Sequence, residues 1–265
     1  MINHDGINNI DLLMAENGIR NCENYSNCKR GVESTLNLSD IPPGAERRGS
    51  RDPQVLIITE APDENSSEGT PYSGSLSTRI VNLFCDDRYG ISLPEPEDNS
   101  FLKFLHYNRF YATSAVKCQV KNGGSALSDY VISKCHERFL RHQIEAMPNL
   151  ELIVPMGRIA ASSITQHSVS SIQITTLIGR YNEGIFPNHR EYNVPIAILP
   201  HPSGINPFAN PPIIKPSDDR HGQEYKIHYR EALSFIRQTL GNLGYDVLEK
   251  SPSLWDSPPG LSEYR

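Results

Sequence analysis

The chain has 265 residues, of which 37% are hydrophobic and 21% are charged, a composition typical of a globular protein with a packed core. No stretch reaches the roughly 20 apolar residues of a membrane-spanning helix, and the first residues lack the basic and apolar regions of a secretory signal. We therefore expect a cytoplasmic protein without membrane association. The net charge of −6 argues against non-specific coating of nucleic acid, but it is compatible with a local basic face.

The first predicted core element is a strand that begins at Val55. Before it, residues 8–16 indicate a short helix that stops at Gly18. The run Val55-Leu56-Ile57-Ile58 is short, apolar and mostly β-branched, which is typical of a buried parallel strand. Because Pro62 cannot donate to a sheet ladder, this strand should end near Ala61.

Strands and helices alternate along the rest of the chain. Further strands are predicted at 110–116, 150–155 and 194–200, and helices at 75–86, 128–147, 158–166 and 223–240. This alternation predicts an α/β fold of three layers, α/β/α, around a central, mostly parallel sheet of four or five strands. We expect residues 1–50 to pack on a core domain of residues 51–245, with residues 246–265 as a mobile tail.

Polar side chains stand at the ends of three predicted strands: Glu60, Ser114 with Lys117, and His201. The carboxyl ends of parallel strands meet at one edge of a sheet, where such folds bind ligands. A carboxylate that stabilises positive charge and an imidazole that donates to a leaving group suit the cleavage of a glycosidic bond. The alternatives are that Glu60 caps a neighbouring backbone N–H and that His201, which precedes a proline, is a turn residue.

The cysteine content argues against a disulfide framework. The chain has five cysteines, an odd number, and no export signal is visible. We expect reduced thiols, some of which ligate a metal. Cys85 lies on the apolar face of a predicted helix and is interpreted as a small buried hydrophobic residue.

Several motifs are informative as an ordered set. They are Glu60-Ala61-Pro62, Gly69 to Gly74 (GTPYSG), Lys117-Cys118, Cys135, Met156-Gly157-Arg158 and His201-Pro202-Ser203. Their order and spacing resemble the uracil-DNA glycosylase superfamily, most nearly its iron–sulfur type, family 4. The resemblance extends from about residue 22 to about residue 206 and includes the last predicted helix.

The resemblance implies a role for each matching residue. Glu60 is the carboxylate near the anomeric carbon, and His201 binds the base oxygen on which negative charge develops. Tyr72 matches the aromatic residue that stacks on the flipped base, with a half-buried turn tyrosine as the alternative. The remaining implied contacts are Ala61 and Ser114 with the base, and Lys117, Ser203, Gly204, Ile205 and Asn206 with DNA.

The resemblance also implies a [4Fe–4S] cluster held by Cys22, Cys28, Cys118 and Cys135. Sixteen residues separate Cys118 from Cys135, close to the family spacing. Five residues separate Cys22 from Cys28, where the family more often has two, so a structural zinc or free thiols are the alternatives.

Other departures from the family pattern concern the base. Ser114 stands where the family has an Asn that reads the Watson–Crick edge of uracil, and a serine cannot make that paired contact. Thr59 and Asp63 replace the two glycines of the family's GEAPG motif, and Tyr72 replaces a Phe. These changes suggest that the base is not plain uracil, and glucosylated hydroxymethylcytosine of phage DNA is one candidate.

Our main hypothesis is therefore a monomeric, monofunctional DNA glycosylase that flips uracil or a modified pyrimidine out of DNA and leaves an abasic site. A defence enzyme that excises glucosylated hydroxymethylcytosine is one alternative. The others are a module that binds modified DNA without cleaving it and an unrelated α/β enzyme that acts on a small nucleoside.

Overall fold

The computed structural model describes residues 10–20, 22, 49–62, 105, 108–118, 127–166, 168–169, 192, 194–199, 201, 236, 238 and 240–242. Several predictions lie outside these residues. They are the helix at 75–86, Tyr72, Asp63, Cys28, Cys85, the DNA contacts at 203–206 and the tail at 246–265.

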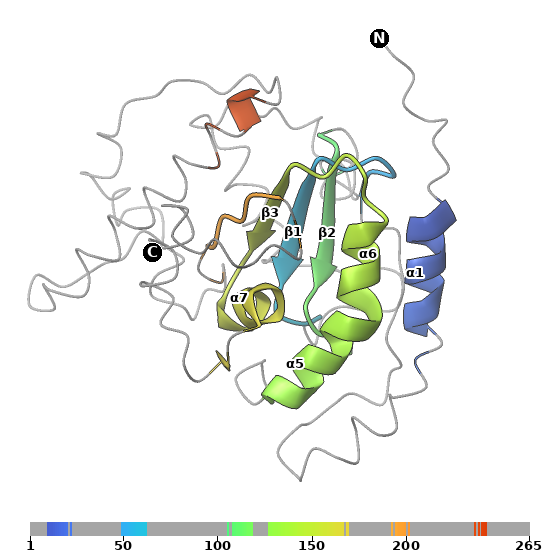
Figure 1. Ribbon diagram of the computed structural model, residues 1–265, viewed down its shortest axis with the longest axis vertical. Coiled ribbons are helices and arrows are strands. Elements are labelled where there is room, and N and C mark those ends of the chain that lie inside the picture. Colours follow the sequence, from blue (N-terminus) through green and yellow to red (C-terminus); the bar gives the residue numbers. More distant parts are fainter. Residues whose placement is uncertain are drawn as a thin grey trace, which may run out of the picture.

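The centre of the fold is a parallel sheet of three strands in the order β2-β1-β3. These strands are β1 (Val55–Thr59), β2 (Phe110–Ser114) and β3 (Leu152–Pro155), and Figure 1 shows all three pointing the same way. Every residue in them is buried, which explains why their sequences do not alternate between apolar and charged residues. The predicted parallel sheet is confirmed.

The segment 194–199 lies beside β3, as predicted, but it is not a regular strand. It makes two isolated parallel bridges, Ile153 with Ile196 and Met156 with Leu199. Its backbone donates from Ala197 N to Ile153 O at 2.9 Å. Because Pro195 has no N–H, the ladder on this segment is incomplete at its start. The described sheet therefore has three full strands, and the predicted four or five are not confirmed.

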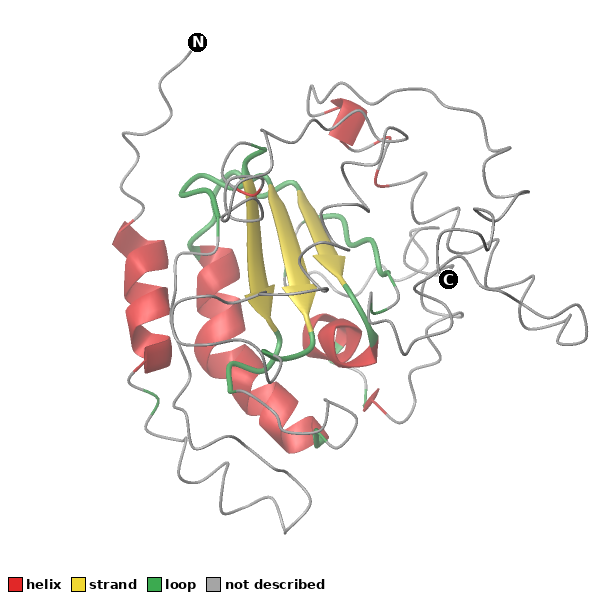
Figure 2. Ribbon diagram, turned by 180° about the vertical axis from the view of Figure 1, so that it is seen from behind, coloured by secondary structure: helices red, strands yellow, loops and turns green. Residues whose placement is uncertain are grey.

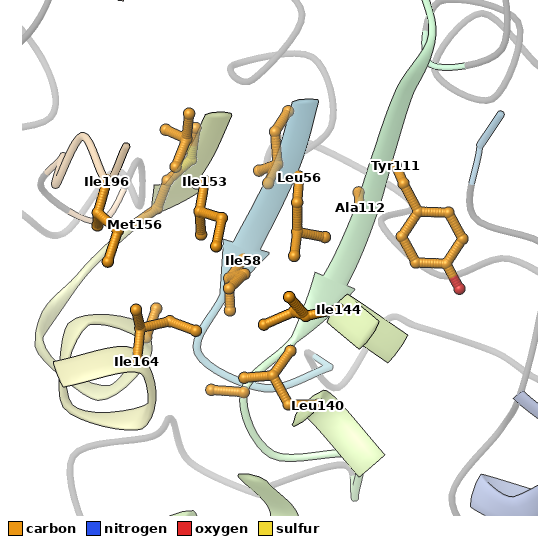
Figure 3. Close-up of a cluster of buried hydrophobic side chains, with 14 of the residues drawn as sticks. Leu56, Ile58, Tyr111, Ala112, Leu140, Ile144, Ile153, Met156, Ile164 and Ile196 are labelled. Carbon is orange, nitrogen blue, oxygen red and sulfur yellow. The ribbon is translucent and has the colours of Figure 1, made fainter. Parts of the chain in front are cut away.

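One face of the sheet is covered by helices from the middle of the chain. The first is a continuous helix made of α5 (Asp129–Cys135), a π-helical turn η3 (His136–Leu140) and α6 (Arg141–Glu145), and it confirms the predicted helix at 128–147. The second is α7 (Arg158–Thr165). Figure 3 shows Leu140, Ile144 and Ile164 from these helices on the side of the sheet where Leu56 and Ile58 lie. The second helical layer of the predicted arrangement is not established by the described residues (Figure 2).

The N-terminal helix α1 (Ile10–Arg20) packs beside α6 (Figure 1). The prediction that it stops at Gly18 is wrong, because the helix continues through that glycine. A helical glycine costs about 1 kcal/mol relative to alanine, and here the burial of Ile19 against Phe139 compensates for that cost. Glu16 anchors the helix to the sheet, since its carboxylate accepts from Tyr111 Oη at 2.8 Å.

Within the part of the chain that the structure describes, no helix is long and apolar enough to cross a bilayer.

Candidate active site

The strand ends gather at one edge of the sheet, just where α7 begins. Met156 N donates to Ile58 O at 2.7 Å, which joins the end of β3 to the end of β1. Gly157 N donates to Leu199 O at 2.8 Å, so the segment that leads to His201 is held beside the same edge. Figure 1 shows α7 below the tips of the strands. These backbone hydrogen bonds fix the positions from which the side chains after each strand project.

Glu60 and His201 come together over Gly157. A Cβ built on Gly157 would lie 2.5 Å from Glu60 Oε1 and 3.0 Å from His201 Cβ, so both side chains border the same point. Both are largely but not completely buried. The structure thus brings the predicted carboxylate and imidazole to one place, from positions 141 residues apart in the sequence.

The Glu60 carboxylate meets the first turn of α7. Burial raises the pKa of Glu60 to about 7, while a hydrogen bond from the backbone N–H of Ile159 and the positive charge of Arg158 act in the opposite direction. Burial disfavours the charged form of an acid, and a helix N-terminus favours it. The alternative that Glu60 caps a backbone N–H therefore describes part of its geometry, and a carboxylate held in this way can still take up a proton near pH 7.

His201 is neutral at physiological pH. Burial lowers its pKa from 6.5 to about 4. A neutral imidazole has one N–H donor and one acceptor nitrogen. At pH 7, His201 can therefore donate a hydrogen bond to an oxygen without carrying a charge itself.

Ser114 is buried and its hydroxyl faces Thr59. The two residues are register partners on β1 and β2, and their Oγ atoms lie 3.3 Å apart. Ser114 is 1% exposed and Thr59 is fully buried, so neither presents surface to a base in this structure. The two positions at which the sequence departs from the family pattern beside Glu60 are thus in contact with each other.

Lys117 points into the protein rather than toward a surface that DNA could reach. It is 3% exposed, and its Nζ donates to Gln143 Oε1 at 2.6 Å, to Ser114 O at 2.6 Å and to Thr113 Oγ1 at 2.7 Å. This placement does not support the predicted contact between Lys117 and DNA. Instead the amine ties the end of β2 to α6. Ala61, the remaining predicted base contact that is described, is partly buried and packs on the core.

The chain was compared with models of known protein families. The model of the uracil DNA glycosylase superfamily matches residues 46–221, which is more than half of the sequence. The chain belongs to the uracil-DNA glycosylase superfamily. Members of this superfamily are DNA glycosylases and act on DNA. A search of curated proteins gave no match.

The superfamily match includes all of the edge described above. Glu60, Gly157 and His201 lie within it, whereas α1 and the cysteines at 22 and 28 lie before its first residue. The family model therefore covers the elements that position Glu60 and His201 in this uracil-DNA glycosylase superfamily member.

The predicted metal ligands are only partly described. Cys118 and Cys135 are buried in the main core, and Cys22 packs against the Ile19–Phe139 pair. None of these three cysteines forms a disulfide with another described residue. Among the described residues, no group of three or more His, Cys, Asp or Glu side chains could hold a metal ion. The fourth predicted ligand, Cys28, is not among them.

Sequence reasoning gave no role in the site to Gly157, Ile159 or Gln143, although Gly157 stands in the Met156-Gly157-Arg158 motif. A glycine between a strand and a helix is a signal for a backbone conformation that other residues avoid, so its position carried a usable signal. Ile159 acts through its backbone N–H, and Gln143 lies on a helix that is remote in sequence from Lys117. The residue types isoleucine and glutamine therefore give no signal of a role in the site.

Proposed function

We propose that this superfamily member is a monofunctional DNA glycosylase that hydrolyses the N-glycosidic bond of uracil or a modified pyrimidine and leaves an abasic site. The observation that carries the proposal is the meeting of Glu60 and His201 over Gly157 at the carboxyl edge of the sheet. The Glu60 carboxylate and the His201 side chain border one point there, and an acid with a neutral hydrogen-bond donor suits cleavage of this bond.

In the proposed reaction, the two side chains act on opposite sides of the bond that breaks. The base leaves with the electron pair of the C–N bond, and His201 donates a hydrogen bond to the base oxygen that becomes negative. The ionised Glu60 stabilises positive charge on the sugar and accepts a proton from the attacking water, whose oxygen bonds to the anomeric carbon. A general base is most effective when its pKa lies near the working pH, and the pKa of Glu60 is about 7.

Water, rather than an amine, is the proposed nucleophile. A lyase step would need an accessible amine that forms a Schiff base with the sugar. Lys117 lies shortly after the end of β2. Its amine is buried and donates hydrogen bonds to Ser114 O on β2 and to Gln143 on α6. This arrangement supports hydrolysis that ends at the abasic site.

The proposed substrate is flipped from the DNA stack before cleavage. Extruding a base costs a few kcal/mol, which stacking and hydrogen bonding in the enzyme must offset. Tyr72 is the proposed stacking platform. A base already weakened in its pairing by damage or modification would be extruded at lower cost.

The proposed alternative to uracil is a modified pyrimidine. A serine hydroxyl cannot reproduce the paired contact of an amide with the Watson–Crick edge, and the hydroxyl of Ser114 lies beside that of Thr59. On this basis we propose glucosylated hydroxymethylcytosine of phage DNA as the alternative substrate, with defence against phage as the biological role. The same observation motivates the second candidate, a module that binds modified DNA without cleaving it.

A cleavage panel tests these proposals. Single- and double-stranded oligonucleotides carrying uracil, hypoxanthine, hydroxymethylcytosine or its glucosylated form are treated with the protein and then with hot alkali, with Glu60→Gln as the control. Alkali-labile breaks at one base with the wild type, and their loss in the control, support the glycosylase. Tight binding without breaks at enzyme excess overturns it and favours the binding module.

A paired variant tests the choice of base. Thr59→Gly together with Ser114→Asn makes room for an amide and restores the family residues at both positions. We expect this double variant to raise the rate at uracil relative to the modified base. An unchanged ratio of the two rates would mean that the hydroxyl pair does not select the base.

We further propose that Cys22, Cys28, Cys118 and Cys135 hold a [4Fe–4S] cluster, which would serve as a structural cross-link. The burial of Cys118 and Cys135 in one core cluster is compatible with thiolates shielded from solvent. Iron, sulfide and zinc are measured in protein purified without oxygen, with Cys85→Ala as the control for Cys118→Ala. Four irons and four sulfides per chain, lost only in Cys118→Ala, would support the cluster. A stoichiometric amount of zinc would indicate a zinc site instead of the cluster. If neither iron nor zinc is found, the cysteines are free thiols.

A further inference from the structure

Gly157 occupies a position at which any side chain would be strained. Its φ is +95°, in the region that L side chains rarely adopt. A Cβ there would lie 2.5 Å from Glu60 Oε1, 3.1 Å from Glu60 Cδ and 3.0 Å from His201 Cβ. The nearest of these distances is well below any normal contact between a Cβ and an oxygen, so a side chain at 157 forces something to move.

The backbone of Gly157 is not free to make that movement. Its N–H donates to Leu199 O at 2.8 Å, and its carbonyl accepts from Ala161 N at 2.9 Å in the first turn of α7. The preceding Met156 donates to Ile58 O at 2.7 Å. Three elements therefore hold this short stretch of backbone: β1, the segment 194–199 and α7.

The group that can move is the end of the Glu60 side chain. The backbone of Glu60 is fixed, because its carbonyl accepts from Val116 N at 3.0 Å. Among the described residues, its carboxylate meets the hydrogen bond from Ile159 N–H and the positive charge of Arg158. A methyl group at position 157 would thus displace the carboxylate from the start of α7, in addition to the backbone strain that any L side chain meets at φ +95°.

We propose that Gly157 is a positioning residue for Glu60: the missing side chain at 157 leaves the space in which the carboxylate sits between the N-terminus of α7 and His201. The catalytic part of this inference rests on the proposed glycosylase activity. The positioning part concerns only where the carboxylate lies and can be tested without any substrate.

The test compares Gly157→Ala with the wild type in three measurements. We expect kcat to fall at least tenfold while KM changes less than threefold, because a displacement of about 1 Å in a reacting group can cost about 100-fold in rate. The acid limb of the pH profile should move to higher pH, since the displaced carboxylate stays buried but loses the Ile159 hydrogen bond and the nearby Arg158 charge. Carbon NMR of the Glu60 carboxyl should show the same upward movement in the absence of DNA.

Gly18→Ala is the matched control, because nothing lies within 4 Å of a Cβ at that glycine. It should leave both the rate and the Glu60 titration as in the wild type. A folded Gly157→Ala protein with an unchanged Glu60 titration would overturn the positioning role, whatever its activity. If the wild type cleaves no DNA, the proposed function fails, and the titration still decides the positioning.

A second variant covers the case in which Gly157→Ala does not fold. Glu60→Asp shortens the acid by one methylene and makes room for the added methyl group. We expect the double variant Glu60→Asp with Gly157→Ala to fold, and Gly157→Ala to cost less activity in this background than in the wild type. If the double variant also fails to fold, the requirement for glycine comes from its backbone conformation alone, and the proposal is wrong.

Discussion

The hydroxyl groups of Thr59 and Ser114 lie 3.3 Å apart, at the last register position shared by β1 and β2. Thr59 Oγ1 also lies 3.4 Å from Thr113 O, so the threonine links both neighbours on the adjacent strand. Because Glu60 follows Thr59 directly, this pair fixes the end of the strand from which the carboxylate projects. The pair stands where the family pattern has a glycine and an asparagine.

The Thr59–Ser114 pair should contribute to stability as a unit. We expect Thr59→Val and Ser114→Ala each to lower the free energy of unfolding by about 1 kcal/mol, because each removes a buried hydrogen-bonding group. The double variant should lose less than the sum of the two, since both single changes remove the same contact. Urea unfolding measures all three, and Ser133→Ala, on an exposed helix face, is the control. Strict additivity would show that the hydroxyls do not interact.

The rate of glycosidic cleavage should follow the ionisation of Glu60. The reaction needs the carboxylate, and its pKa is about 7, so kcat/KM should rise about tenfold per pH unit below pH 7 and level off above it. Protonation of His201 falls outside this range, because its pKa is about 4. Glu60→Gln should lower the rate by about 100- to 10,000-fold and leave a profile without the acid limb. An acid limb that survives in this variant would assign the titration to another group.

Glu60 and His201 should have opposite effects on stability as the pH changes. The pKa of Glu60 is raised from 4.5 to about 7, so its contribution is present below pH 4.5 and is lost as the pH rises to 7. The pKa of His201 is lowered from 6.5 to about 4, so its contribution is present above pH 6.5 and is lost as the pH falls to 4. Each effect amounts to at most about 3 kcal/mol.

Between pH 4.5 and 6.5 these two effects should cancel in the wild type. A substitution of either Glu60 or His201 alone should remove this cancellation. The stability of Glu60→Gln should decrease as the pH falls from 6.5 to 4, and that of His201→Asn should decrease as the pH rises from 4.5 to 7. Thermal unfolding across this range measures both slopes. Parallel curves for the wild type and Glu60→Gln would mean that burial does not raise the pKa of Glu60.

Lys117 should behave as an interior residue and not as a phosphate contact. We expect Lys117→Met to lower the free energy of unfolding by about 1–3 kcal/mol, because the hydrogen bonds to Gln143 and Ser114 O are lost in a buried place. The salt dependence of DNA binding should not change, whereas loss of a phosphate contact would lower its slope by about one. Lys134→Met is the control, because Lys134 is partly exposed and forms a salt bridge with the exposed Glu137 on the same helix face. A reduced slope for Lys117→Met would restore the predicted contact with DNA.

The strands and the middle helices could be predicted because their signals are local. The buried run at Val55 and the helix that begins after Gly157 follow from apolar pattern and punctuation alone. The stop predicted at Gly18 was wrong because a local glycine signal was outweighed by a tertiary contact, the packing of Ile19 on Phe139. Propensity is a weak guide wherever packing opposes it.

The details of the site depend on register and backbone conformation, which residue types alone do not reveal. The sequence singled out Ser114 and Thr59 separately, but only the pairing of β1 with β2 shows that they touch. Lys117 was interpreted as a DNA contact because the Lys117-Cys118 motif resembles the family pattern. Its partner Gln143 comes from α6, and that contact depends on how the helix packs on the sheet.

The π-helical turn η3 lets its helix hold one more residue than a regular helix would between the same two ends. A π-turn closes i→i+5 hydrogen bonds, so it takes up the added residue within one turn, and the residues before and after it keep their α-helical facing. A regular helix with all of these residues would advance by a further rotation of about 100°, which would direct Gln143 away from the Lys117 amine and Ile144 away from the sheet. The widened turn at His136–Leu140 thus determines that Gln143 is the side chain that supports the end of β2.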